Sequence, residues 1–252
     1  MIAKIILFFS SIYIPLFILS TYSTLNLNKL IQKKRILNED VSQKILSIKE
    51  GFIPSYHPNI TKKRAHRYGI YPIGTLPNTK TYYCNEGYGL ITYHSDRFGL
   101  RNLDTKWGDI QNKSNIFIIG DSFAKGACVP NKATIDNVIQ NSVKTNVLNL
   151  AFGANGPYEY QAILKSMVAP IVRESEEENI VIIIFFLNDN INLDYKSEEL
   201  FQHTNSIISI NDDGEVIPKD FYIRQINKLI KENYPFKKSS LIRSQKYKFI
   251  SM

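Results

Sequence analysis

Three short apolar runs, separated by segments with helical spacing, constrain the fold of this chain most. They occupy residues 116–119, 147–150 and 180–187, and the last is the most apolar run beyond the N-terminal segment. Runs of this length without polar alternation are typical of strands buried on both faces of a parallel sheet. The intervening segments, 134–142 and 157–174, have the spacing of helices. Strands alternating with helices predict right-handed βαβ units and therefore an α/β fold.

Each of the three runs ends in residues that can do chemistry. The first is followed by Gly120-Asp121-Ser122, the second by Gly153-Ala154-Asn155-Gly156, and the third by Asn188-Asp189. In parallel sheets, ligands bind at the carboxyl ends of the strands. We therefore expect these three loop tips to converge on one site.

A serine in the turn between a strand and a helix is a candidate nucleophile for acyl transfer, and here it is Ser122. An oxyanion on the substrate carbonyl could accept hydrogen bonds from the Ser122 amide, from an amide of Gly153 or Ala154, and from the Asn188 side chain. The alternatives are that Ser122 only caps the following helix and that Asn188 only closes a turn. Asp121 is expected to brace its loop rather than to transfer protons.

At these positions the sequence resembles the SGNH (GDSL-type) hydrolase family. Gly120-Asp121-Ser122-Phe123 is similar to the first block of that family, the glycine turn after Asn149-Leu150 to the second, and Asn188-Asp189 to the third. Residues 40–58, 84–87 and 95–102 are similar to the segment that precedes the domain in membrane-anchored bacterial members, so the resemblance covers roughly residues 40–195.

The resemblance implies a three-layer, flavodoxin-like parallel sheet and a serine esterase or O-acyltransferase without a metal or organic cofactor. The substrate would be a small acyl ester or an acylated carbohydrate. Ser122 would be the nucleophile, and Gly153, Ala154 and Asn188 would form the oxyanion hole. The competing hypothesis is a non-catalytic anchored module that keeps the pocket to bind an acylated glycan or a partner protein.

Two departures from the family pattern bear on activity. Ala154 stands where the second block usually has glycine. The family's last block, an Asp-x-x-His pair that supplies the general base, is missing, because none of His57, His66, His94 and His203 has an aspartate three residues before it. We expect a C-terminally incomplete sheet with three of five parallel strands and an apolar edge that a partner could cover.

The N-terminal segment predicts an anchor or a signal. No charged residue occurs between Lys4 and Lys29, and 24 uncharged residues are long enough to cross a bilayer. An uncleaved membrane anchor, a cleaved signal peptide and a buried core helix are the three interpretations. The basic residues after the segment favour a cytoplasmic domain by the positive-inside rule, whereas the resemblance favours an extracytoplasmic one.

We expect four parts: an anchor or signal at 1–25, a helical stalk at 26–50, a turn-rich lead-in at 51–114, and a partial α/β domain at 115–252. The stalk has helical spacing in two pieces, with Asp40 placed to cap the second and Gly51 to stop it. Near the C-terminus, residues 207–217 are typical of a hairpin, and 221–231 and 240–250 of amphipathic helices. A calcium loop at 211–214 is the rival interpretation of the hairpin turn.

Composition narrows the function classes further. The formal net charge is +8, but the basic residues are scattered, so a nucleic-acid partner is not expected. No metal-ligand spacing is present. Cys84 and Cys128 are the two cysteines, and they can be either an exported disulfide or two buried thiols.

Overall fold

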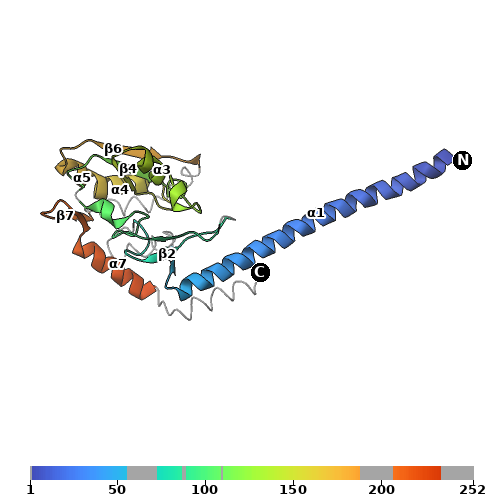
Figure 1. The fold of residues 1–252 in the computed structure, drawn as a ribbon, viewed down its shortest axis with the longest axis horizontal. Coiled ribbons are helices and arrows are strands. Elements are labelled where there is room, and N and C mark those ends of the chain that lie inside the picture. Colours follow the sequence, from blue (N-terminus) through green and yellow to red (C-terminus); the bar gives the residue numbers. More distant parts are fainter. Residues whose placement is uncertain (1, 56–72, 87–88, 109, 188–206, 234–252) are drawn as a thin grey trace.

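The structure, a computed structural model, describes residues 2–55, 73–86, 89–108, 110–187 and 207–233. It is a mixed α/β fold with a small parallel sheet (Figure 1). The three predicted strands are confirmed as β4 (Asn115–Gly120), β5 (Asn146–Asn149) and β6 (Asn179–Ile184). They are all parallel in the order β5-β4-β6. The first strand is thus central, and the chain crosses from one side of it to the other between β5 and β6.

Helices pack on both faces of this sheet. The predicted helix at 134–142 is α3 (Ile135–Ser142). The one predicted at 157–174 consists of α4 (Pro157–Ile163), a π-helical turn (Leu164–Val168) and α5 (Ala169–Glu174). Within it, the Ser166 hydroxyl donates to the carbonyl of Ala162 at 2.7 Å.

Side-chain alternation along β4 explains why both faces are covered. Phe117 and Ile119 point into the larger core, together with Ile163 and Met167 of the α4–α5 segment. Ile116 and Ile118 point into a smaller core, against which Ile139 of α3 packs. Because neither face of β4 is polar, the strand is stable only between two apolar layers.

The lead-in forms a second small sheet of β1 (Ile53–Pro54), β2 (Lys80–Tyr82) and β3 (Thr92–His94). β1 pairs with β2 in parallel, and β2 pairs with β3 antiparallel. A 3-10 helix, η2 (Asp104–Trp107), ends in a fully buried tryptophan, and another, η3 (Asn131–Ala133), precedes α3. Trp107 packs edge to face on Phe98 at 4.6 Å, and both belong to the same core as Phe117. The lead-in therefore shares the core of the parallel sheet.

After the gap at 188–206, the chain forms the predicted hairpin and one of the two predicted helices. The hairpin is β7 (Ile208–Ile210) and β8 (Val216–Pro218), which pair antiparallel, and the helix is α7 (Asp220–Asn233). Ile208, Val216 and Tyr222 are buried in the core that contains Phe117. The helix predicted at 240–250 lies outside the described residues.

The N-terminal segment is one continuous helix, α1 (Ile2–Lys49), which projects away from the rest of the molecule (Figure 1). The prediction of two helical pieces was therefore wrong, whereas the predicted stop at Gly51 is confirmed, because Gly51 has a φ of 93°. The predicted membrane anchor is not supported, since no helix within the described residues combines the length and the apolar character that a bilayer crossing requires.

The edge strand β6 is apolar and only partly covered. It pairs with β4 alone among the described strands, and Ile180, Val181 and Ile183 are 45%, 38% and 48% exposed.

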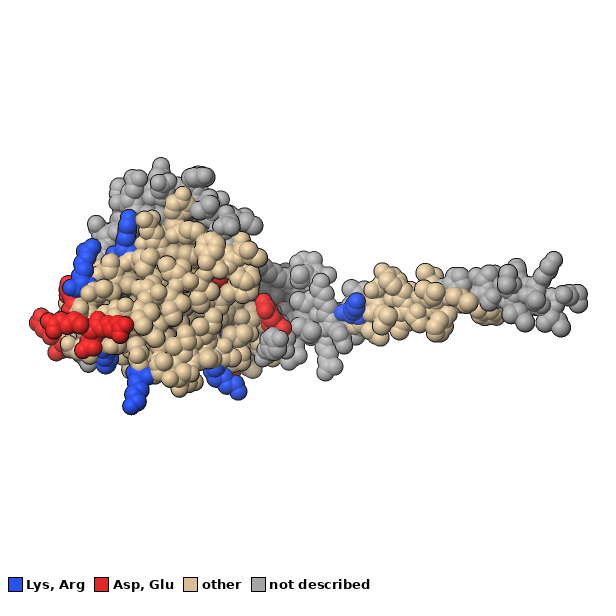
Figure 2. Space-filling model, turned by 90° about the horizontal axis from the view of Figure 1, so that it is seen from above, with Lys and Arg blue, Asp and Glu red and all other residues tan. Residues whose placement is uncertain are grey.

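The face of the molecule in Figure 2 is mostly uncharged, with Lys and Arg side chains scattered around its margin rather than gathered in a patch.

Candidate active site

Ser122 lies in the tight turn that follows the central strand β4. The turn is braced by Asp121, whose buried carboxylate accepts a hydrogen bond from the Phe123 amide at 2.8 Å, as expected from the sequence. Two backbone hydrogen bonds close the turn, from the Lys125 amide to the Asp121 carbonyl and from the Ala127 amide to the Ser122 carbonyl. Ser122 is partly exposed, and its hydroxyl makes no hydrogen bond to another described residue. The side chain is thus positioned by its backbone and is open to a ligand.

The glycine before this turn is required by packing. A Cβ on Gly120 would lie 2.5 Å from the Ala124 Cβ and 2.9 Å from the Ile184 carbonyl oxygen. Only glycine lets the turn fold back this closely on the end of β6.

The glycine turn after β5 lies against the Ser122 turn. The Phe152 amide donates to the Gly120 carbonyl at 3.2 Å. A Cβ built on Gly153 would stand 3.9 Å from the Ser122 Cβ and 3.3 Å from the Tyr83 hydroxyl. Two of the three predicted loop tips therefore meet.

Ala154 and Asn155 complete this second turn. Ala154 has a φ of 62°, the left-handed conformation that favours glycine, so the backbone keeps the glycine geometry although the residue has changed. Asn155 is buried, and its Nδ2 has no hydrogen-bond partner within the described part of the chain. One donor of this turn is therefore unused.

The third predicted tip, Asn188, lies outside the described residues. The chain that leads to it is close to the nucleophile turn, because the ring of Phe186 stacks on that of Phe123 with centroids 3.9 Å apart. The carboxyl ends of β4 and β6 therefore meet where the strand order reverses, which is the usual ligand position in open α/β sheets.

The histidines supply no base at this site in the described part of the chain. His57, His66 and His203 are not described. His94 lines a cavity of about 410 Å³ with Arg101 and Asp136, and none of the described residues that line it belongs to the Ser122 turn. Its Nδ1 is 3.1 Å from the Ser95 carbonyl oxygen. Among the described residues, no three His, Cys, Asp or Glu side chains are placed to hold a metal.

A disulfide joins the lead-in to the loop that follows Ser122. Cys84 and Cys128 are bonded, with their Cα atoms 5.2 Å apart, so they form a disulfide and are not two buried thiols. In the same region, the buried Arg101 guanidinium donates to the carbonyls of Gly126 and Val129. The loop is thus held on one side by a covalent bond and on the other by hydrogen bonds.

Asn149 connects the two turns to the lead-in. Its Nδ2 donates to the Ala124 carbonyl and to the Asp136 carboxylate, each at 2.9 Å, while its Oδ1 accepts from the Ala151 amide. The Asn149 amide in turn donates to the Asn102 Oδ1 at 2.8 Å. The buried Asn149 therefore joins the two turns through its side chain and joins β5 to the lead-in through its backbone.

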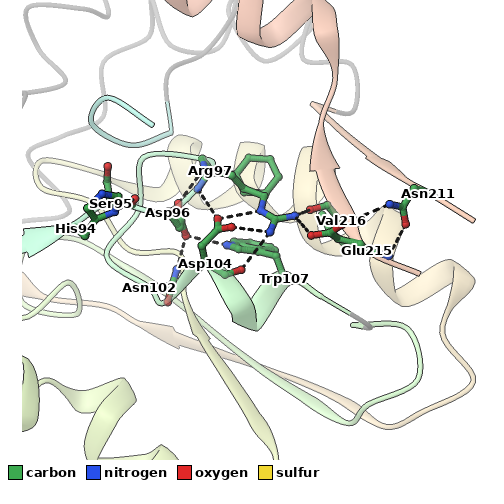
Figure 3. A network of polar contacts seen from close by, with 11 residues as sticks. His94, Ser95, Asp96, Arg97, Asn102, Asp104, Trp107, Asn211, Glu215 and Val216 are labelled. Carbon is green, nitrogen blue, oxygen red and sulfur yellow. Dashed lines mark hydrogen bonds and ion pairs between the residues drawn. The ribbon is translucent and has the colours of Figure 1, made fainter. Parts of the chain in front are cut away.

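Asp96 and Arg97 organise the lead-in itself (Figure 3). The buried Asp96 carboxylate accepts hydrogen bonds from Asn102 and Trp107 and from two backbone amides. Burial raises the pKa of Asp96 to about 6. Arg97 forms ion pairs with Asp104 and with Glu215 next to β8. The C-terminal hairpin is therefore attached directly to the segment that supports the site.

Sequence reasoning missed two residues beneath the site, Lys125 and Tyr83. Lys125 is 1% exposed, and its Nζ lies 4.1 Å from the ring centroid of Tyr83 and 3.9 Å from that of Phe152. Burial lowers the pKa of Lys125 well below its ordinary value and raises that of Tyr83. The spacing Ser-x-x-Lys was the signal in the sequence, since residues three apart on a helical turn share a face.

Comparison of the chain with family models, with curated proteins and with solved structures gives no match. A function for this chain is therefore inferred from the geometry of the two turns and from the motifs in them.

Proposed function

We propose that this chain is an SGNH-type serine esterase or O-acyltransferase that acts on the ester bond of a small acyl group, with Ser122 as nucleophile. The observation that carries the proposal is the approach of the Ser122 and Gly153 turns at the carboxyl-terminal edge of the parallel sheet, since a Cβ at Gly153 would stand 3.9 Å from the Ser122 Cβ. The finer architecture that we propose is a flavodoxin-like sheet that has its apolar edge at β6 within the described residues.

The chemistry follows from the donors around this position. The Ser122 amide and an amide of the Gly153–Ala154 turn would stabilise the oxyanion that forms when the Ser122 hydroxyl attacks an ester carbonyl. We assign the third donor to Asn188, and the stacking of Phe186 on Phe123 supports this assignment. Each such donor typically lowers the barrier by about 3 to 4 kcal/mol.

The Cys84–Cys128 disulfide supports an oxidising compartment for the domain. We therefore propose an extracytoplasmic location, where acylated carbohydrates are accessible substrates. This assignment does not require a membrane anchor.

One observation favours a second function, that of a non-catalytic module which binds an acylated glycan or a partner protein. The sequence contains no Asp-x-x-His pair, and without a base a serine hydroxyl is a weak nucleophile. In this alternative the Ser122 turn would serve recognition only.

A fluorophosphonate probe separates the two functions, because it reacts only with an activated serine. We expect the purified full chain to be labelled and Ser122→Ala to lose labelling completely. Ser142→Ala is the matched control, since Ser142 is exposed at the end of α3 and bonds only its own helix. Circular dichroism verifies that each protein is folded.

The result that contradicts the esterase assignment is an absence of labelling in a folded wild-type sample, or labelling that persists in Ser122→Ala. Either result would favour the binding module, which can then be tested with acetylated oligosaccharides by calorimetry.

A further inference from the structure

Lys125 is an unusual residue to find fully buried. It is 1% exposed, whereas lysines are almost never fully buried without a charged partner. No carboxylate of a described residue pairs with it, and the polar contact of its Nζ is a long one, 3.4 Å to the Ser55 hydroxyl. A permanent ammonium group in this position would be expensive.

Three aromatic rings surround the amine instead. Their centroids lie 3.9 Å (Phe152), 4.1 Å (Tyr83) and 5.6 Å (Tyr93) from Nζ. Burial, together with the nearby charge of Arg101, lowers the pKa of Lys125 well below its ordinary value. Burial thus favours the neutral amine, while the ring faces stabilise an ammonium group when one forms. A group with both properties can accept and return a proton.

The same residues place this amine beneath the candidate nucleophile. Lys125 follows Ser122 by three positions on one helical turn, whose hydrogen bond joins the Lys125 amide to the Asp121 carbonyl. Phe152 immediately precedes Gly153, and the Tyr83 hydroxyl is 3.3 Å from the Cβ position of Gly153. One of the rings that hold the amine, that of Tyr83, thus carries the hydroxyl next to Gly153, the residue that faces Ser122.

We propose that Lys125 is the general base for Ser122 and takes the place of the missing histidine. This proposal rests on the esterase function proposed above. To reach the Ser122 hydroxyl, the flexible side chain gives up its long hydrogen bond to Ser55 and part of its contact with the rings of Tyr83 and Phe152. Contacts between a base and its nucleophile are commonly looser before the substrate binds.

The proposed step balances without any co-reactant. The Ser122 oxygen forms a bond to the ester carbonyl carbon, its proton moves to the Lys125 amine, and the carbonyl electron pair moves to the oxygen. When the intermediate collapses, the bond to the leaving alkoxide breaks, and the ammonium group returns the proton to that alkoxide. Water or an acceptor hydroxyl then attacks the acyl-serine carbonyl, and Lys125 takes its proton. The bond between the Ser122 oxygen and the acyl carbon breaks, the ammonium group returns the proton to the Ser122 oxygen, and the acid or the new ester leaves.

The test is the rate of fluorophosphonate labelling of the full chain between pH 5 and pH 10. Lys125→Met keeps the length and packing of the side chain but has no basic group, and Lys125→Arg is permanently protonated and cannot accept a proton. We expect both variants to be labelled at least about 100-fold more slowly than wild type. The wild-type rate should rise with pH to a plateau, with an inflection well below pH 10 that is missing in Lys125→Met.

Rescue by an added amine separates a catalytic role from a structural one. We expect ethylamine to raise the labelling rate of Lys125→Ala at least about tenfold, because the truncated side chain leaves room for a small base. The absence of any rescue in folded Lys125→Ala would overturn the proposal. This readout remains available if Lys125→Met does not fold.

The outcomes also distinguish the two proposals from each other. If Lys125→Met is labelled within about threefold of the wild-type rate while Ser122→Ala is not labelled, the esterase stands and Lys125 is not its base. A wild-type rate without an inflection between pH 5 and pH 10 overturns the base as well. If folded wild type is never labelled, both proposals fail.

Discussion

Ala154 holds a conformation that suits glycine, at the point where the second turn faces Ser122. A left-handed φ costs a residue with a Cβ roughly 1 to 2 kcal/mol, and Ala154 adopts it with a φ of 62°. The backbone of the turn is therefore fixed by its surroundings rather than by the residue itself. This bears directly on whether the departure from the family pattern reduces activity.

We expect Ala154→Gly to leave the rate of fluorophosphonate labelling within about twofold of wild type, because the amide already points where a glycine amide would. Stability should change by less than about 1 kcal/mol, since relief of strain is offset by the greater freedom of glycine in the unfolded chain. Labelling kinetics and urea denaturation measure the two quantities. A tenfold faster rate would show that the alanine limits the site.

The Asp96 carboxyl makes stability depend on pH. Its pKa is raised to about 6 by burial, compared with about 3.9 in an unfolded chain. The folded state then binds the proton more tightly than the unfolded chain does. The contribution of Asp96 to the free energy of unfolding is therefore lost as the pH rises from about 4 to about 6. Asp104, whose pKa is lowered by its hydrogen bond to Arg97, acts in the opposite direction and only at lower pH.

Between pH 7 and pH 5 we therefore expect Asp96 to add about 1 kcal/mol to the free energy of unfolding of the wild type. Asp96→Asn cannot titrate and should not show this gain. Urea denaturation at both pH values measures the difference, in which the histidine contributions common to both proteins cancel. Equal pH dependence in the two proteins would contradict this assignment.

At the residue scale, the sequence revealed the turn residues but not the buried charges. Ser122 and Gly153 were predictable as turn residues, because a small residue directly after an apolar strand usually lies in a tight turn. Lys125 and Asp96 were not, since a single sequence assigns a lysine or a loop aspartate to the surface by default. Only the folded structure places three aromatic rings around Lys125 and four hydrogen-bond donors around Asp96.

At the scale of elements, the disulfide connects two segments whose local interactions are weak. It joins Cys84, just after β2, to Cys128 in the loop beyond Ser122, across a sequence separation of 44 residues. Neither segment is held by a long helix or strand. Much of the order of the nucleophile loop should therefore depend on this bond.

We expect reduction of the Cys84–Cys128 bond to lower the free energy of unfolding by about 4 kcal/mol, as loop-closure entropy predicts for a loop of this length. Urea denaturation with and without dithiothreitol measures the change, and thiol titration verifies the reduction. The control is the variant with both cysteines replaced by serine, which dithiothreitol should not affect. A wild-type stability insensitive to reduction would count against the bond.

Elements were predictable where periodicity is strong and local. The strands β4, β5 and β6 were evident because short apolar runs, rich in isoleucine in β4 and β6, have few alternatives, and α3 and α7 because their apolar residues recur on one face. The pairing of β1 with β2 was not, because two residues of strand carry no pattern and find their partner across the lead-in. The continuity of α1 was also missed, since a possible cap at Asp40 does not by itself end a helix.

At the scale of the whole molecule, one core joins parts that look separate in the sequence. It extends from Ile73 in the lead-in, through Trp107 and Phe117, to Tyr222 and Ile226 of α7. The Arg97 ion pairs with Asp104 and Glu215 add a polar connection between the lead-in and the hairpin (Figure 3). The sequence suggested a turn-rich lead-in separate from the α/β domain, but its residues Phe98 and Trp107 are buried in the shared core.

This shared interior restricts how such a chain can be rearranged. A segment that supplies part of a core cannot be exchanged for the corresponding segment of another protein unless the new side chains fit closely against the rest of the core. A chimera joined near residue 115 would replace, in one step, the core residues beyond the junction that share a core with Phe98 and Trp107. Homologous recombination should therefore preserve residues 73–226 as a block, and engineered variants of the site are better made by point substitution than by swapping modules.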